Sequence, residues 1–378
     1  MTRKLIFSLA LVLFVNVLFA QVNLPTIKAT SKKVDVRDGD NFMKGDWNIT
    51  PEAKPDIYTT SSKGKKVTFY TDLDSISVRI TTTTKFDFII LLNDTTKALT
   101  EIQYKPGYLD ILKGSDKYNI NDNRPIPKFT YQSMDNQNLV KIRKDFNLDS
   151  VAGKGNEIYR ILSLMHWVHN IVKHDGSSNN PALRNAIDLI AVCKKENRGV
   201  NCRMMATILN ECYLSMGIKS RFITCWPKDT TDIDCHVINM VYSNSLNKWI
   251  WIDPTFDAYV MNEKGELLGI QEVRERLING KTIILNPEAN WNRQNSQTKE
   301  YYIEFYMTKN LYRLRTPVVS EYDTETSRTG KELTFVDLIP FDGTGQTPQK
   351  KEETEIGTGM KFTYYKTNNP IIFWTKPE

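Results

Sequence analysis

The feature that most constrains the fold of this chain is a helical stretch followed by three short apolar strands. Apolar side chains recur at helical spacing along residues 202–216 and stop at Gly217, which predicts a buried helix. The strands that follow have apolar residues on both faces, which indicates an interior sheet. These runs are Ser220 to Trp226, Cys235 to Tyr242 and Lys248 to Asp253. We therefore expect an α+β core over residues 150–265, with helices packed on an antiparallel sheet.

Cys202 stands at the start of the predicted helix. The first backbone N–H groups of a helix have no partner within it, and together with the positive end of the helix dipole they stabilise an anion. A cysteine at this place is therefore suited to form a thiolate. The alternative for a lone cysteine at a helix start is a packed, unreactive thiol.

His236 and Asp253 supply the other two groups of a thiol site. If Tyr242 pairs with Asn247 around a short loop, His236 lies opposite Asp253 on the neighbouring strand. The carboxylate can then orient the imidazole, which takes a proton from Cys202 and returns it. No other histidine lies C-terminal to Cys202. The predicted catalytic residues are therefore Cys202, His236 and Asp253.

Four blocks of sequence, in this order, resemble the core of the transglutaminase-like superfamily. They are Gly199 to Arg203, Gly217 to Arg221, Cys235 to Val237 and Trp249 to Thr255. The resemblance covers roughly residues 155–260, and it implies a papain-like core whose Cys202, His236 and Asp253 act on amide or peptide bonds.

The resemblance also implies a side-chain donor upstream of the cysteine that helps to stabilise an oxyanion. Trp167 is the oxyanion candidate by type, beside the backbone N–H of Cys202. The alternative for Trp167 is an aromatic ring packed on its own helix. Asn239 ranks behind Asp253 as the side chain that orients His236, because it lies on the same strand as the histidine.

The remaining histidines are His166, His169 and His174. His166 and His169 are spaced to share one face of a helix, so a metal site there is an alternative that we do not favour. His174 is expected to end the helix and to begin a turn at the edge of the cleft. We predict no metal and no cofactor.

The N-terminus and the cysteines bear on localisation. Arg3 and Lys4 precede an apolar run that ends at Ala20, which predicts a signal peptide over residues 1–20 and export to the periplasm or the extracellular space. An uncleaved anchor is the alternative; after cleavage we expect no stable membrane insertion. The chain has five cysteines, an odd number that suggests a free thiol with disulfides possible among the others. For the four besides Cys202 we favour small buried side chains.

The flanking regions have strand character. Residues 21–135 combine alternating strands with proline-rich turns, which predicts an all-β sandwich-like domain, a candidate for binding a protein or a glycan. Residues 266–378 are expected to form a β-rich extension with an aromatic-rich strand over residues 301–312 and a mobile loop at 342–359.

Charge and chemistry together limit the function. The net charge of +6 is spread along the chain without a basic block, so we expect no nucleic-acid partner. The favoured function is a secreted cysteine hydrolase that acts on a protein or peptide substrate through an acyl-enzyme on Cys202. The alternatives are a protein-glutamine acyltransferase (cross-linking enzyme) that uses the same triad, and a non-catalytic module that binds a protein or glycan.

Overall fold

The computed structural model describes residues 23–378, which form two compact units. One unit ends at Gly107 and the other runs from Tyr108 to Glu378. The predicted signal peptide lies outside the described residues. Within residues 23–378, no helix is both long enough and apolar enough to cross a membrane. The division comes before the expected boundary at residue 135, because helix α1 (Tyr108–Gly114) buries Leu112 in the core of the second unit.

The first unit is built from two four-stranded sheets. The order of one sheet is β1 (Thr26–Ala29), β7 (Lys85–Leu92), β8 (Thr96–Tyr104) and β4 (Asp56–Thr60). The order of the other is β3 (Asn41–Asn48), β2 (Lys33–Asp38), β5 (Lys66–Tyr70) and β6 (Ser75–Arg79). The buried rings of Phe69 and Phe88 pack together across the two sheets at 5.4 Å. The all-β sandwich-like prediction is confirmed, with parallel pairing of β1 with β7 and of β4 with β8.

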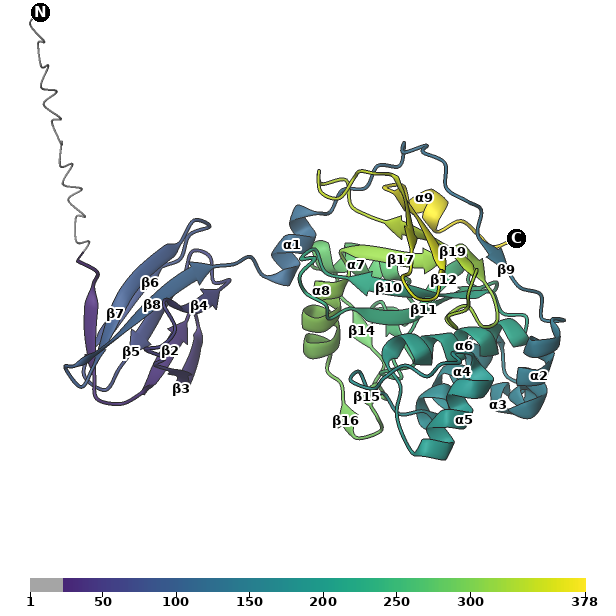
Figure 1. Ribbon diagram of the computed structural model, residues 1–378, viewed down its shortest axis with the longest axis horizontal. Helices are drawn as coiled ribbons and strands as arrows, with labels where there is room; N and C mark the ends of the chain where they lie inside the picture. Colours follow the sequence, from purple (N-terminus) through teal and green to yellow (C-terminus); the bar gives the residue numbers. More distant parts are fainter. Residues whose placement is uncertain (1–22) are drawn as a thin grey trace, which may run out of the picture. The chain divides into compact units, whose positions relative to one another are not determined.

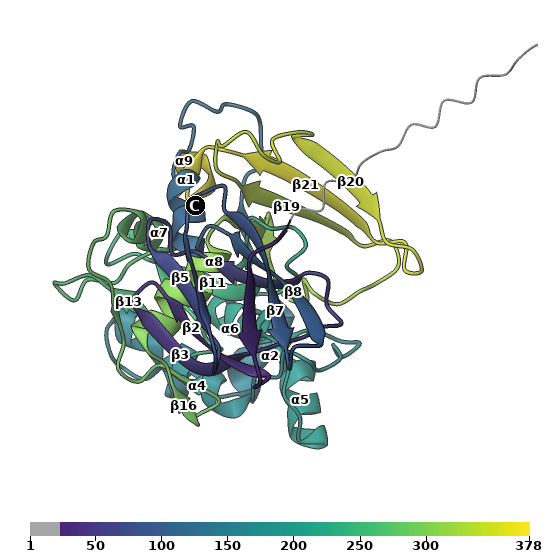
Figure 2. The same ribbon diagram turned by 90° about the vertical axis from the view of Figure 1, so that its left-hand side faces the viewer.

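The second unit is organised around a seven-stranded sheet. Its order is β12 (Lys248–Ile252), β11 (His236–Ser243), β10 (Ser220–Trp226), β17 (Arg313–Pro317), β19 (Glu332–Leu338), β21 (Lys361–Thr367) and β20 (Lys350–Thr354). Neighbouring strands are antiparallel except for β19 and β21. Figure 2 shows β19, β21 and β20 side by side.

Both faces of this sheet are buried where β11 and β12 pair. Met240 and Trp251 belong to one hydrophobic cluster, whereas Val241 and Ile250 belong to the other. This alternation follows from the two-residue period of a strand and confirms the prediction of an interior sheet. Three small strand pairs complete the unit: β9 (Thr130–Tyr131) with β18 (Val319–Ser320), β13 (Val260–Met261) with β14 (Ile284–Leu285), and β15 (Asn290–Trp291) with β16 (Asn295–Ser296).

Helices contribute to both clusters. Figure 1 labels these helices along the chain. The Val241 cluster is built by α2 (Gln137–Asp145), α3 (Leu148–Ala152), α4 (Glu157–Ile171), α5 (Ala186–Glu196) and α6 (Cys202–Ser215). The Met240 cluster is built by α1, α7 (Ile270–Ile278), the π-helix η1 (Glu300–Met307), and α9 (Pro370–Phe373), while α8 (Thr308–Asn310) continues η1. The predicted α+β core, with helices on an antiparallel sheet, is therefore confirmed.

The register of the β11–β12 hairpin differs from the prediction. Tyr242 pairs with Trp249 and not with Asn247, so the loop comprises residues 244–247. Asn247 has φ of 51°, a left-handed conformation that asparagine tolerates better than most residues. The difference is two residues along one strand, which preserves the face of every side chain. His236 and Asp253 therefore remain on the same face although they are not directly opposed.

Two downstream segments also differ from the expectations. Residues 301–312, expected as a strand, instead form η1 and α8 before β17 begins. The segment 342–359, expected as a mobile loop, contains β20, whose residues are all exposed and pair with β21. β20 carries charged residues in place of apolar ones, as edge strands often do, and so it lacks the pattern by which a strand is predicted.

Candidate active site

Cys202 is the first residue of α6. Asn201 caps this helix, because its side chain accepts a hydrogen bond from the Met204 N–H at 3.1 Å. The N–H groups of Cys202 and Arg203 lie in the first turn and have no acceptor within the helix. The side chain of Cys202 is half-buried. The thiol therefore sits beside backbone donors at a helix start, as the sequence predicts.

His236 and Asp253 form a buried pair on neighbouring strands. Their Nε2 and Oδ2 atoms are 2.7 Å apart, and the two side chains are 1% and 0% exposed. The other carboxylate oxygen of Asp253 accepts from the Thr255 N–H at 2.8 Å. Because an ionised carboxylate only accepts hydrogen bonds, Nε2 of His236 donates to it. The Nδ1 atom of His236 is thereby left for the thiol.

Two imidazoles, those of His174 and His236, interact with the thiol of Cys202. Burial alone would raise the pKa of Cys202, but these two imidazoles outweigh burial and lower the pKa to about 6. Burial would lower the pKa of His236, but Asp253 and the Cys202 thiolate outweigh it and raise that pKa. A thiolate–imidazolium pair of Cys202 and His236 is therefore favoured near neutral pH.

Asp253 has a further partner that the sequence did not reveal. The Tyr302 hydroxyl donates to Asp253 Oδ2 at 2.5 Å and accepts from Trp251 Nε1 at 3.1 Å. Tyr302 comes from the π-helix η1, in a segment that the sequence predicts as a strand. The spacing of aromatic residues was the available sequence signal for this segment. The prediction took it as the two-residue period of a strand, whereas the segment is helical.

Aromatic rings surround the imidazole of His236. The rings of Tyr306 and Phe256 lie 5.3 Å and 5.5 Å from it, measured between centroids. These rings keep water from the His236–Asp253 pair, which strengthens its electrostatic interaction.

The described contacts of the Trp167 ring are with hydrophobic side chains and not with the triad. Its ring lies 5.6 Å from the ring of Phe146, and it packs on the hydrophobic cluster that α2, α3 and α4 share. The oxyanion candidate is therefore in the packed role that was its alternative. Asn239, the second candidate for orienting His236, instead donates from its Nδ2 to the Ala206 carbonyl at 2.9 Å.

Hydrogen-bond partners occupy one ring nitrogen of His166 and both ring nitrogens of His169. His166 Nδ1 lies 2.7 Å from Asp257 Oδ2. His169 contacts the Pro254 carbonyl at 3.0 Å and Asn290 Oδ1 at 2.9 Å. In the described part of the chain, no group of three or more His, Cys, Asp or Glu side chains is placed to hold a metal ion.

All five cysteines are free thiols. Cys193, Cys212 and Cys225 are buried, as the preferred interpretation expects, whereas Cys235 is half-buried like Cys202. Burial raises the pKa of Cys235. The pKa values of the two half-buried thiols are therefore shifted in opposite directions, down for Cys202 and up for Cys235.

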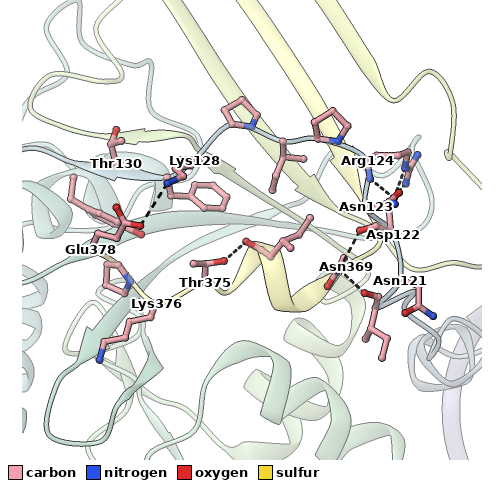
Figure 3. A pocket seen from close by; sticks show the side chains of 18 residues that line it. Asn121, Asp122, Asn123, Arg124, Lys128, Thr130, Asn369, Thr375, Lys376 and Glu378 are labelled. Carbon is pink, nitrogen blue, oxygen red and sulfur yellow. Dashed lines mark hydrogen bonds and ion pairs between the residues drawn. The ribbon is translucent and has the colours of Figure 1, made fainter.

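Among residues 23–378, three cavities have linings that contain no triad residue. One of about 870 Å³ is lined by residues 120–131, Asn369, Ile372 of α9 and residues 375–378 (Figure 3). No triad residue lines it. Another of about 460 Å³ is lined by Arg203, the neighbour of Cys202, and by Trp226 and Arg315 among others. The second cavity therefore borders the helix start that carries the thiol.

The comparison with protein families agrees with this geometry. Residues 144–254 match the model of the transglutaminase-like superfamily. This segment belongs to that superfamily. The match contains Cys202, His236 and Asp253 and supports a cysteine-dependent hydrolase or acyltransferase. A comparison with curated proteins finds no significant match.

The solved structures to which this chain is similar include the following three. A protein from Cytophaga hutchinsonii, provisionally named a cysteine protease, is 19% identical over 39% of this chain and 47% of its own, with a TM-score of 0.26. LapG of Legionella pneumophila, in EGTA-treated form, is 14% identical over 38% of this chain and 76% of its own, with a TM-score of 0.25. Red sea bream transglutaminase is 11% identical over 66% of this chain and 52% of its own, with a TM-score of 0.25. The chain thus spans about half the length of the first and third. These likenesses are too distant to support an inference about activity.

Proposed function

We propose that this protein is a cysteine hydrolase that cleaves peptide or amide bonds through an acyl-enzyme on Cys202. The observation that carries the proposal is the position of His236, which interacts with the Cys202 thiol while Asp253 holds its Nε2 at 2.7 Å. A thiolate, an imidazolium and an orienting carboxylate are the groups that acyl transfer through a thioester requires. The superfamily match of residues 144–254 supports the same chemistry.

In the proposed reaction the Cys202 sulfur attacks the carbonyl carbon of the scissile bond. A C–S bond forms, and the carbonyl oxygen becomes an oxyanion that the Cys202 backbone N–H stabilises. The His236 imidazolium gives its proton to the leaving nitrogen, and the C–N bond breaks. Water then gives a proton to His236 and attacks the thioester, and the C–S bond breaks to release a carboxylic acid.

The reaction can be tested with a peptide library, analysed by mass spectrometry with and without a primary amine such as cadaverine. We expect products that have gained water, and we expect Cys202→Ser to abolish them. Products that carry the amine in place of water would identify an acyltransferase and overturn hydrolysis. If the library is unchanged and no thioester forms on Cys202, the non-catalytic alternative holds.

We also propose that the protein is exported. The proposal rests on residues 1–20, where a basic start, an apolar run and Ala20 follow the pattern of a signal peptide. Mass spectrometry of the N-terminus of the protein made in a Gram-negative bacterial host tests it. A chain that begins at Gln21 is expected, and one that retains residues 1–20 contradicts cleavage.

A further inference from the structure

His174 is held beside the approach to Cys202 by several backbone contacts. It forms a β-bridge with Val200, two residues before the cysteine. The flanking bonds run from the Val200 N–H to the Lys173 carbonyl at 3.0 Å and from the Asp175 N–H to the Val200 carbonyl at 2.8 Å. The loop that carries His174 is therefore fixed to the segment that leads into α6.

Asn292 adds two hydrogen bonds to the backbone of His174. Its Oδ1 accepts from the His174 N–H at 2.7 Å, and its Nδ2 donates to the His174 carbonyl at 2.9 Å. Asn292 lies in the turn between β15 and β16. The same hairpin contacts α4, because Asn290 Oδ1 lies 2.9 Å from His169 Nε2. The hairpin thus connects the backbone of His174 to a buried histidine on α4.

The tautomer of His174 follows from its contact with Trp291. The indole Nε1–H is a donor only, and it donates to His174 Nδ1 at 3.0 Å. Nδ1 must therefore be the acceptor, and the neutral ring carries its proton on Nε2. The imidazole of His174 also lowers the pKa of the Cys202 thiol. Because Trp291 occupies Nδ1, Nε2–H is the ring donor that remains to face the thiol.

We propose that His174 is a fixed hydrogen-bond donor of the thiol site, whose Nε2–H stabilises first the Cys202 thiolate and then the oxyanion of the tetrahedral intermediate. The oxyanion part rests on the proposed hydrolase function. The oxyanion is the former carbonyl oxygen, and its carbon is bonded to the Cys202 sulfur. A donor that reaches the sulfur is therefore placed beside this oxygen. No proton is transferred: His174 donates together with the Cys202 backbone N–H. Trp291 and Asn292 are positioning residues.

His174 and His236 have different hydrogen-bond partners and therefore suit different roles. His236 has a carboxylate on Nε2, which stabilises an imidazolium and suits proton transfer. His174 has an indole N–H on Nδ1, which opposes a proton at that atom and suits a neutral donor. The sequence prediction placed His174 at the cleft edge and gave it no catalytic role, because a lone histidine after a helix does not reveal its partner Trp291.

Two rates separate the parts of the proposal. Alkylation by iodoacetamide reports the thiolate and passes through no oxyanion, whereas acylation by 4-nitrophenyl acetate passes through one. Both rates are measured against pH on full-length protein that carries Cys235→Ser. This substitution removes the other half-buried thiol, so that the labelling reports on Cys202. Other titratable or charged groups that interact with the sulfur are Arg203, Cys225 and Tyr306, and they are unchanged in all variants.

For His174→Ala we expect the alkylation midpoint of Cys202 to rise. At a pH where the thiolate is fully formed, we expect acylation to fall by about 10- to 100-fold while alkylation is unchanged, because one oxyanion donor is lost. His174→Gln, whose amide can donate, should recover part of the acylation rate. Trp291→Phe should lower acylation less than His174→Ala does. Lys173→Ala, an exposed neighbour, is the matched control and should change neither rate.

Three outcomes decide the matter. If the alkylation midpoint rises but saturated acylation does not fall, His174 affects only the thiolate and the oxyanion role is overturned. If neither rate changes in His174→Ala, the whole proposal is overturned. If the parent protein itself neither alkylates fast nor forms a thioester on Cys202, the hydrolase function fails instead, which distinguishes the two failures.

Discussion

At the scale of single residues, the site depends on how Asp253 is held. One carboxylate oxygen accepts from the Thr255 N–H, and the other accepts from both His236 and Tyr302. A carboxylate that accepts hydrogen bonds from three donors is held in one orientation. The orientation of His236 toward Cys202 therefore depends on residues that never touch a substrate.

We predict that Tyr302→Phe slows acylation of Cys202 by 4-nitrophenyl acetate by about 10-fold, because a hydrogen bond to a charged group contributes about 1.5–3 kcal/mol. The ring remains, so the fold and the far-ultraviolet circular dichroism should not change. Tyr301→Phe is the control, since Tyr301 lies on the same helix with its side chain half exposed. An acylation rate equal to that of the parent protein would show that Tyr302 does not support Asp253.

The residue types of the triad and their order along the chain can be predicted from the sequence. The residues that contact and support the triad cannot. Cys202, His236 and Asp253 stand at a helix start and at strand ends, which periodicity locates. Tyr302, Trp251 and His174 act through contacts between segments far apart in the chain, and no local pattern encodes those contacts.

At the scale of elements, the β11–β12 hairpin is anchored to the helix that packs beside it. Glu157, the first residue of α4, accepts hydrogen bonds from the Asn244 N–H at 2.9 Å and the Ser245 N–H at 2.8 Å. The Ser243 hydroxyl also donates to it at 2.8 Å. Burial would raise the pKa of Glu157, but these hydrogen bonds outweigh it and lower the pKa to about 2.

We predict that Glu157→Gln lowers the free energy of unfolding by about 1–2 kcal/mol at pH 7, measured by urea denaturation. Because the folded-state pKa is depressed, the stabilisation is present above the ordinary pKa near 4.5 and is lost as pH falls toward 2. The difference between parent and variant should therefore be smaller at pH 3 than at pH 7. Glu288→Gln, at an exposed carboxylate, is the control. An equal difference at both pH values would contradict the role of the ionised carboxylate.

The elements themselves were predictable where the apolar period was clear. α6, β10, β11 and β12 lie close to their expected positions. The prediction of the hairpin register was wrong because two four-residue loops, 243–246 and 244–247, are consistent with the sequence. The second is formed, and in it Asn247 adopts a left-handed conformation. The prediction of a strand at η1 was wrong because the buried positions 302, 303 and 307 fit the wide turn of a π-helix. Such helices are too rare to expect from a sequence.

At the scale of the whole molecule, the residues of the candidate site all belong to the unit Tyr108–Glu378. The hydrophobic clusters of that unit contain no residue before Leu109. The β-rich extension expected after residue 265 is part of this unit, because β17 pairs directly with β10 in its central sheet. The first unit has a separate core.

We predict that a chain lacking residues 1–107 folds and keeps the fast alkylation of Cys202 at pH 7. Its core is complete without the first unit, so the alkylation rate should lie within about twofold of the full-length value. The measurement is the rate of iodoacetamide labelling, with urea unfolding as the check on folding. A folded fragment with a slow Cys202 would mean that the first unit contributes to the site.

The most direct test of the central claim is the pH dependence of Cys202 alkylation by iodoacetamide, compared with that of Cys235 in the same protein. We predict that labelling of Cys202 rises with a midpoint near pH 6, far below the ordinary thiol value of about 8.5, while Cys235 labels only at higher pH. In His236→Ala, the midpoint for Cys202 should move up because the imidazolium is lost. If Cys202 labels no faster than Cys235 at pH 7, Cys202 is not an activated nucleophile and the account is contradicted.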